Sequence, residues 1–180
     1  MYVNKTCKPV KFSRRKVVLF FSLLATFRAS LIYGQASKKE VGRVTGFPIP
    51  RYVSAKSNKM NVRRGPGKDY KIDWIYKQKG NPFIITAEFG PWRRIEDFEG
   101  EGGWVHYSLI SGVRHIIVLD QVLLLKRKPK INSSNIAQLN RGVVAKLLSS
   151  KSSWCAVQVG KYKGWLPTDS IWGLDKNEIF

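Results

Sequence analysis

Short stretches in which apolar and polar residues alternate account for much of the chain after residue 51. Residues 52–56, 60–63 and 154–159 alternate in this way, with the period of a half-buried β-strand. Other β-favouring runs occupy 74–76, 83–88, 92–97, 104–106, 114–119, 121–125, 136–139 and 143–148. Apart from one helical turn at 108–110, residues 52–173 show no helical period. Many short strands separated by Gly and Pro turns predict small all-β barrels or sandwiches.

The pattern repeats after 62 residues. Trp92 and Gly80 recur as Trp154 and Gly142, and Gly103-Trp104-Val105 recurs as Gly164-Trp165-Leu166, shifted by one. A fixed internal period indicates one small unit used twice. We therefore expect two barrels, residues 52–112 and 113–175, each of about sixty residues, a size near the lower limit for a separate core. The repeated tryptophans are predicted to be core residues.

The first 36 residues have the pattern of a secretory signal peptide. Six Lys or Arg lie between residues 5 and 16, a largely apolar run covers 17–27, and Gly34-Gln35-Ala36 offers small residues for cleavage. The run is shorter than the roughly 20 residues that span a bilayer, although an uncleaved membrane anchor remains an alternative. Residues 37–51, with Gly42, Gly46, Pro48 and Pro50, are predicted to be a linker.

Net charge changes the expected partners. The formal charge is +20 for the whole chain and +13 without residues 1–36, which draws a protein to polyanions through a salt-sensitive attraction. The first unit carries +3 and the second +8. The densest basic cluster is Lys126, Arg127, Lys128 and Lys130. It is either a solvated loop or a contact for an anionic envelope surface.

Residues able to do chemistry are few. Cys155 is the only cysteine after residue 36, and its place in an alternating segment predicts a small buried apolar side chain. One Cys and the separated His106 and His115 cannot form a zinc site, so no cofactor or metal is expected. Glu96, Asp97, Glu99 and Glu101 lack the spacing of a calcium loop and are assigned to a charged hairpin that protects a sheet edge.

Met60-Asn61-Val62-Arg63-Arg64-Gly65-Pro66-Gly67 resembles the opening motif of the bacterial SH3 (SH3b) domain family. Trp92, Gly103-Trp104-Val105 and Leu109 are similar to the second half of that domain, and Trp154-Cys155 and Trp172-Gly173 resemble the second repeat of its tandem exported members of alphaproteobacterial type. The second unit lacks the Asn and the turn glycines. The resemblance implies an all-β fold of two tandem SH3-like barrels, after a signal-peptide helix and a linker, and a non-catalytic role in binding peptidoglycan or envelope peptides.

The motif's Gly65-Pro66-Gly67 is predicted to be a type II turn with a positive φ at Gly67. Aromatic residues that the second unit does not repeat are the candidate ligand contacts. A side chain that occurs in one unit only is not needed for the core that both units share. The candidates are Tyr70, Trp74 and Tyr107, which align with Asn132, Ile136 and about Thr168. Together with Lys126, Arg127, Lys128 and Lys130, they make up the predicted ligand-binding set.

Three function classes are compatible with this sequence. The leading hypothesis is a periplasmic or secreted binding and adaptor module for peptidoglycan or an envelope peptide or protein, with no enzyme activity and no stable membrane span after cleavage. The second is a cytosolic nucleic-acid-binding or other polyanion-binding protein, which the export signal disfavours, so no nucleic-acid partner is expected. The third is a cell-wall hydrolase that would use Cys155 as its nucleophile.

Overall fold

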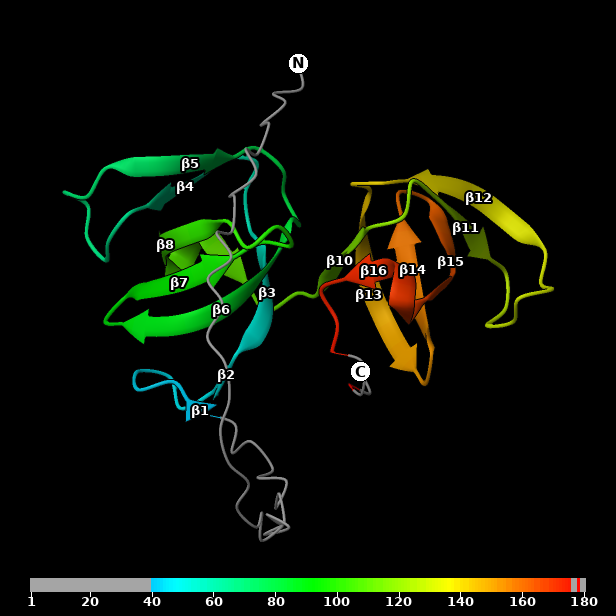
Figure 1. Cartoon of the computed structure of the whole chain (residues 1–180), viewed down its shortest axis with the longest axis horizontal. Helices are drawn as coiled ribbons and strands as arrows, with labels where there is room; N and C mark the ends of the chain where they lie inside the picture. Colours follow the sequence, from blue (N-terminus) through cyan, green and yellow to red (C-terminus); the bar gives the residue numbers. More distant parts are fainter. Residues whose placement is uncertain (1–39, 176–177, 179–180) are drawn as a thin grey trace, which may run out of the picture. The chain divides into compact units, whose positions relative to one another are not determined.

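The computed structural model describes residues 40–175 and residue 178. The predicted all-β fold of two tandem small barrels is confirmed (Figure 1). The predicted signal peptide, residues 1–36, lies outside the described residues. Within the stretch predicted to be a linker, β1 (Glu40–Val41) and β2 (Pro48–Ile49) pair as a short antiparallel hairpin. No helix in the described part of the chain is long and apolar enough to span a membrane.

The first barrel is a curled seven-stranded sheet with the order β5-β4-β8-β7-β6-β3-β9. Neighbouring strands are antiparallel. The strands are β3 (Arg51–Ala55), β4 (Met60–Arg63), β5 (Ile72–Tyr76), β6 (Pro82–Phe89), β7 (Trp92–Glu96), β8 (Gly102–His106) and β9 (Ile110–Ser111), with the 3-10 helix η1 (Tyr107–Leu109) before the last.

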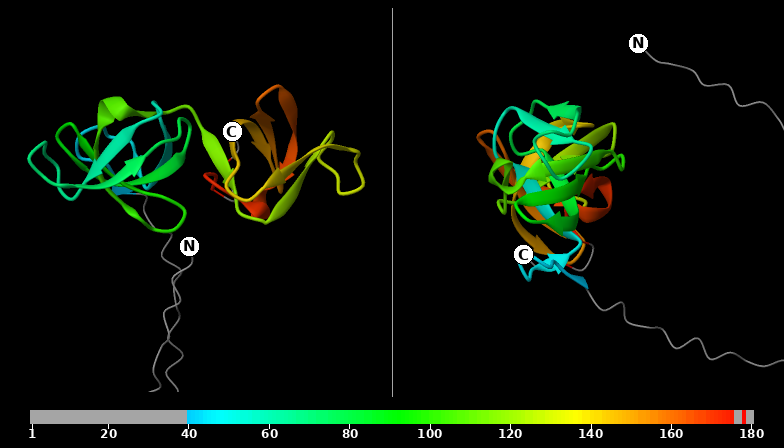
Figure 2. Two further views of the ribbon diagram at one scale, coloured as in Figure 1. Left: turned by 90° about the horizontal axis from the view of Figure 1, so that it is seen from above. Right: turned by 90° about the vertical axis from the view of Figure 1, so that its left-hand side faces the viewer.

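The second barrel has the matching order β12-β11-β15-β14-β13-β10-β16. Its elements are β10 (His115–Val118), β11 (Val122–Lys126), β12 (Asn135–Asn140), β13 (Val144–Lys151), β14 (Trp154–Val159), β15 (Tyr162–Pro167), the 3-10 helix η2 (Thr168–Ser170) and β16 (Ile171–Trp172). In each barrel the first hairpin, β4–β5 or β11–β12, projects beyond the remaining strands (Figures 1 and 2).

Irregularities in strand pairing recur at matching positions and confirm the duplication. The ladder between β4 and β5 shifts register between Val62 and Arg63, and that between β11 and β12 shifts between Leu125 and Lys126. A second shift falls between Ile85 and Ala87 in the first barrel and between Leu147 and Ser149 in the second. Bulges bend strands locally, so both sheets curl at the same two places.

Mainly aliphatic side chains fill both cores, and the prediction that the repeated tryptophans lie there is wrong for Trp104, Trp154 and Trp165, which are partly exposed. Trp92 is buried, at 9% exposure, although it does not belong to the first core cluster. The first core consists of Val53, Ala55, Met60, Val62, Phe83, Ile85, Ile95 and Val105. The second consists of Ile116, Val118, Leu123, Leu125, Leu139, Ala145, Leu147, Cys155, Val157, Leu166 and Ile171. Adjacent strand residues face opposite sides of a sheet. Because Val105 points inward, Trp104 lies on the outer face, where it remains partly exposed.

Gly103 and Gly164, the glycines of the repeated Gly-Trp pairs, lie inside strands β8 and β15. A Cβ added to Gly103 would approach the carbonyl oxygen of Arg63 to 2.5 Å, and one added to Gly164 would approach that of Lys126 to 2.7 Å. Arg63 pairs with Trp104, and Lys126 pairs with Trp165. Each glycine therefore lets two backbones approach closely where β4 meets β8 in the first barrel and where β11 meets β15 in the second.

The two-residue turn between the fourth and fifth strands is Gly90-Pro91 in the first barrel and Ser152-Ser153 in the second, and its first position offers a stability test. Gly90 has a φ of 48° in the first barrel, and Ser152 has a φ of 53° at the same place in the second. A left-handed conformation costs a non-glycine residue roughly 1–2 kcal/mol, while glycine carries an entropic cost of about 0.5–1 kcal/mol.

We expect Ser152→Gly to raise the free energy of unfolding by about 0.5–1 kcal/mol and Gly90→Ser to lower it by a similar amount. Urea unfolding of the two variants beside the parent protein measures both changes. If both substitutions shifted the free energy of unfolding in the same direction, backbone strain at this turn would not explain the shifts.

Candidate functional site

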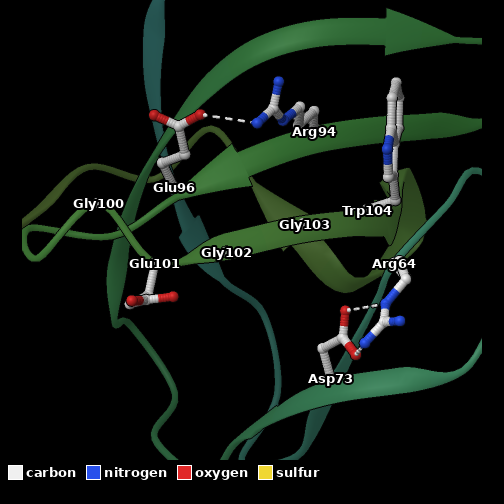
Figure 3. Close-up of a pocket in the computed structure, with 9 residues that line it drawn as sticks. All are labelled: Arg64, Asp73, Arg94, Glu96, Gly100, Glu101, Gly102, Gly103 and Trp104. Atoms are coloured by element: carbon white, nitrogen blue, oxygen red, sulfur yellow. Dashed lines mark hydrogen bonds and ion pairs between the residues drawn. The ribbon is translucent and has the colours of Figure 1, made fainter.

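A polar cavity of about 370 Å³ opens on the outer surface of the first barrel. Arg64 and Asp73 line it from the β4–β5 hairpin, and Arg94 and Glu96 line it from β7 (Figure 3). The backbone around Gly100, Gly102 and Gly103 and the side chains of Glu101 and Trp104 complete the lining. Glycines leave the peptide groups of that strand accessible, so a ligand could contact main chain as well as side chains.

Both arginines of the cavity are held by acids of the same cavity. Arg64 donates from Nη2 to Asp73 Oδ1 at 3.0 Å and from Nε to Oδ2 at 3.3 Å, and this hydrogen bond raises the pKa of Arg64. Arg94 Nη2 lies 3.7 Å from Glu96 Oε1. Exposed pairs of this kind contribute little to stability, because water screens them. A ligand carrying both an acidic and a basic group could therefore exchange partners with them at little cost.

Strand alternation places an indole and an imidazole on the outer face of the same two strands. Trp92 pairs with His106, and Arg94 pairs with Trp104, so these four side chains share a face. The rings of Trp92 and His106 meet edge to face at 5.7 Å. Trp104 is the aromatic member of the cavity. The sequence analysis missed it as a site residue, although the inward assignment of Val105 would have placed Trp104 outside.

Tyr70 is fixed in its loop by the glycines of the motif. A Cβ added to Gly65 would lie 2.5 Å from the Tyr70 ring, and one added to Gly67 would lie 3.1 Å from it. Arg63 Nη1 donates to the Tyr70 carbonyl oxygen at 2.6 Å. The predicted positive φ at Gly67 is wrong, because neither glycine is among the positive-φ residues. Both are needed because the tyrosine ring packs against them.

The three predicted aromatic contacts lie in two places. Tyr70 and Trp74 belong to the β4–β5 hairpin, which also supplies Arg64 and Asp73 to the cavity, and both are exposed. Tyr107 lies in η1, where its backbone amide donates to Pro91 O at 2.9 Å and its ring stacks on His106 at 4.7 Å. Among the described residues, no ring contact joins Tyr107 to the other two.

The predicted basic residues lie at the corresponding hairpin of the second barrel. Lys126 ends β11, and its Nζ donates to Asn135 Oδ1 at 2.8 Å. Arg127, Lys128 and Lys130 are exposed in the loop that follows. Backbone bonds from Arg127 to Ser134 and from Ser133 to Lys130 order that loop, so the three charges are presented on a defined turn.

The side chains considered for catalysis or metal binding contribute to the fold. Cys155 is fully buried in the second core, as predicted, and burial raises its pKa to about 12. Asp97 organises the acidic hairpin by accepting from the amides of Glu99 and Glu101, both at 3.0 Å, and from Tyr76 Oη at 2.8 Å. Burial and that hydrogen bond raise the pKa of Tyr76. Within 40–175 and 178, no group of His, Cys, Asp and Glu is arranged to hold a metal ion.

Comparison with known proteins gives the same division of the chain. A family model described as the bacterial SH3 domain matches residues 56–112 and again residues 122–173. No curated protein matches the chain. The two matched segments correspond to the two barrels, and together they cover more than half of the sequence.

Proposed function

Because the chain belongs to the bacterial SH3 domain family, we propose that it is an exported, non-catalytic binding module that acts as an adaptor at the cell envelope. Domains of this family commonly bind cell wall or peptide ligands. The proposed ligand is peptidoglycan or an envelope peptide. The proposed location is the periplasm or the cell exterior, on the strength of the signal-like pattern in residues 1–36.

The observation that carries this proposal is the cavity on the first barrel. Its nine lining residues provide two arginines, three acids, an indole and an accessible backbone, and they include no Ser, Thr, Cys or His. This set suits recognition of a peptide that bears both carboxylates and amines, which are groups found in cell-wall peptides. It offers no serine, threonine or cysteine nucleophile and no imidazole, and two of its three acids, Asp73 and Glu96, are paired with arginines. Tyr70 and Trp74, on the adjoining hairpin, provide aromatic area for sugar or peptide contacts.

The basic loop of the second barrel favours a second candidate function, binding of a polyanion such as nucleic acid. Arg127, Lys128 and Lys130 project from an ordered turn, and their domain has a net charge of +8. In the leading proposal, the same loop adds a salt-sensitive contact with the anionic envelope.

A pull-down of purified protein with isolated sacculi at low and high salt tests the proposal. We expect retention on sacculi, with the triple variant R127E/K128E/K130E binding about tenfold more weakly at low salt and little differently at high salt. The variant K151E/K161E/K163E, with three exposed lysines on other turns and strand ends, makes the same change in net charge and serves as the control. Equal weakening by both variants would indicate a general charge effect.

Binding to duplex DNA in the same buffers decides between the two candidates. Protein that binds DNA tightly and is not retained on sacculi would replace the envelope proposal with the nucleic-acid function.

A further inference from the structure

Strand β5 lies at an edge of the first sheet. It pairs with β4 on one side, and no other described strand pairs with its second side. An edge strand presents a row of unused N–H and C=O groups that another polypeptide can pair with. Natural proteins usually protect such edges with charged or polar side chains, or make them very short.

Apolar side chains cover this edge instead. Ile72, Trp74 and Ile75 are 41%, 43% and 49% exposed. Trp74 lies opposite buried Val62 and therefore faces the barrel side of the sheet, while Ile75 lies opposite Asn61 on the outer side. A strand added beside β5 would consequently find apolar contacts on both of its faces.

The equivalent edge strand of the second barrel is β12, and it lacks the exposed apolar side chains of β5 at the matching positions. Arg63 of β4 and Lys126 of β11 occupy equivalent positions. Each directly follows the bulge in its strand, and each pairs with a repeated tryptophan, Trp104 or Trp165. Val62 then corresponds to Leu125, so Trp74 corresponds to Ala137, the partner of Leu125. This register differs by one residue from the alignment of Trp74 with Ile136 that the 62-residue period gives.

By the same register, the positions of Ile72 and Ile75 are occupied by Asn135 and Gln138. One barrel therefore has Asn, Ala and Gln at the three positions where the other has Ile, Trp and Ile, while between them Asp73 of the first edge corresponds to Ile136 of the second. Burial does not explain the difference, since all three apolar side chains are exposed.

Charge on the hairpin selects the partner. Residues 60–79 contain six Lys or Arg and two Asp, a net charge of +4. Lys71 and Lys77 lie immediately before and after β5. A second copy of this chain on the edge would oppose +4 with +4, whereas an acidic segment would be attracted at both ends of the strand.

We propose that β5 is an open docking edge that takes an extended acidic segment of another polypeptide as an additional antiparallel strand. The inference rests on the proposed binding function and adds a polypeptide partner to the proposed envelope ligand. Main-chain hydrogen bonds along β5 would provide affinity, and Trp74 and Ile75 would select apolar residues on the two faces of the incoming strand.

The probe is a fluorescent nine-residue peptide with five central valines, which present apolar side chains on both faces of a strand, and two glutamates at each end. We expect it to bind the purified protein at low salt and to slow hydrogen exchange of amides in β5. A peptide N-methylated at alternate residues cannot form one row of hydrogen bonds and should bind at least about tenfold more weakly. The variant I72N/W74A/I75Q, which copies the edge of the second barrel, should lose binding to a similar extent.

Control variants distinguish binding at the β5 edge from binding to any exposed apolar side chain. The variant V122N/L124Q removes two exposed apolar side chains from β11 and should bind the peptide like the parent protein. If the triple variant does not fold, Ile75→Lys, which adds a charge at one exposed position of the edge, provides the same comparison.

Equal binding of the methylated peptide, or equal binding by the edge variants, would overturn the proposal. So would self-association of the parent protein that the edge variants abolish, since the occupant would then be a second copy. Retention on sacculi without peptide binding would overturn the docking edge and leave the envelope function standing. Failure to bind both would remove the envelope function as well.

Discussion

Replacing Tyr70 and Trp74 together with alanine is expected to weaken binding to sacculi at least about 30-fold, equivalent to about 2 kcal/mol. Exposed aromatic side chains concentrate binding free energy because they offer a large rigid surface. Both belong to the hairpin that contributes Arg64 and Asp73 to the cavity. Neither is a member of the first core, so the barrel should remain folded.

Phe89→Ala is the matched control for this double variant. Phe89 is also an exposed aromatic residue of the first barrel, but it ends β6 rather than lying on the β4–β5 hairpin. Affinity is measured from bound fractions over a range of sacculus concentrations, and circular dichroism checks the fold. Undiminished binding by a folded double variant would exclude these two residues from the ligand site.

Glu88→Gln is expected to lower the free energy of unfolding by about 3 kcal/mol at neutral pH, because it leaves buried cationic groups without their counter-charge. The Glu88 side chain is only 1% exposed, and its Oε1 lies 2.7 Å from Arg51 Nη2 and 3.5 Å from Arg93 Nε. Its Oε2 accepts from the amides of Val44 and Thr45, both at 3.0 Å. One carboxylate therefore holds the β1–β2 turn and two arginines.

The pH dependence of this contribution follows from its pKa. Burial by itself raises the pKa of Glu88, but hydrogen bonds from Thr45, Arg51 and Val44 outweigh it and lower the pKa from 4.5 to about 2. A lowered pKa stabilises the folded state above pH 4.5, and this stabilisation is lost as the pH falls from 4.5 toward 2. The difference between parent and variant should shrink over that interval.

Urea unfolding at pH 7 and pH 3 measures both effects, and hydrogen exchange at Val44 and Thr45 locates them at the hairpin. Glu99→Gln, at an exposed position of the acidic turn, controls for the loss of one negative charge. A variant with parent-like stability at pH 7 and unchanged exchange at both amides would contradict this role of the carboxylate.

Most strands of both barrels were predictable because alternation and turn residues agree. The segments 60–63 and 154–159 coincide with β4 and β14. The burial of Cys155 followed from the same alternation. The strand positions of Gly103 and Gly164 were not predicted, since a sequence does not show that the backbone of another strand would pass within 3 Å of a side chain at these positions.

The placement of Trp104, Trp154 and Trp165 failed because recurrence was taken as a sign of the core. Recurrence shows that two copies share a position, and that position can lie on either face of the sheet. The alternation of Trp104 with Val105, which is fully buried, was the available signal for the outer face. The cavity itself could not be predicted, because Arg64 and Glu96 meet only through strand pairing between distant segments.

Attachment of the β1–β2 turn to Glu88 has a mechanical consequence. A pull on the chain at Glu40 would reach the charged hydrogen bonds around that carboxylate before it reached the ladder between β3 and β6. Several bonds converging on one side chain share the load in parallel, whereas a ladder pulled from its end opens one rung at a time. For a module tethered through this segment, resistance to force would then weaken as the surroundings acidify.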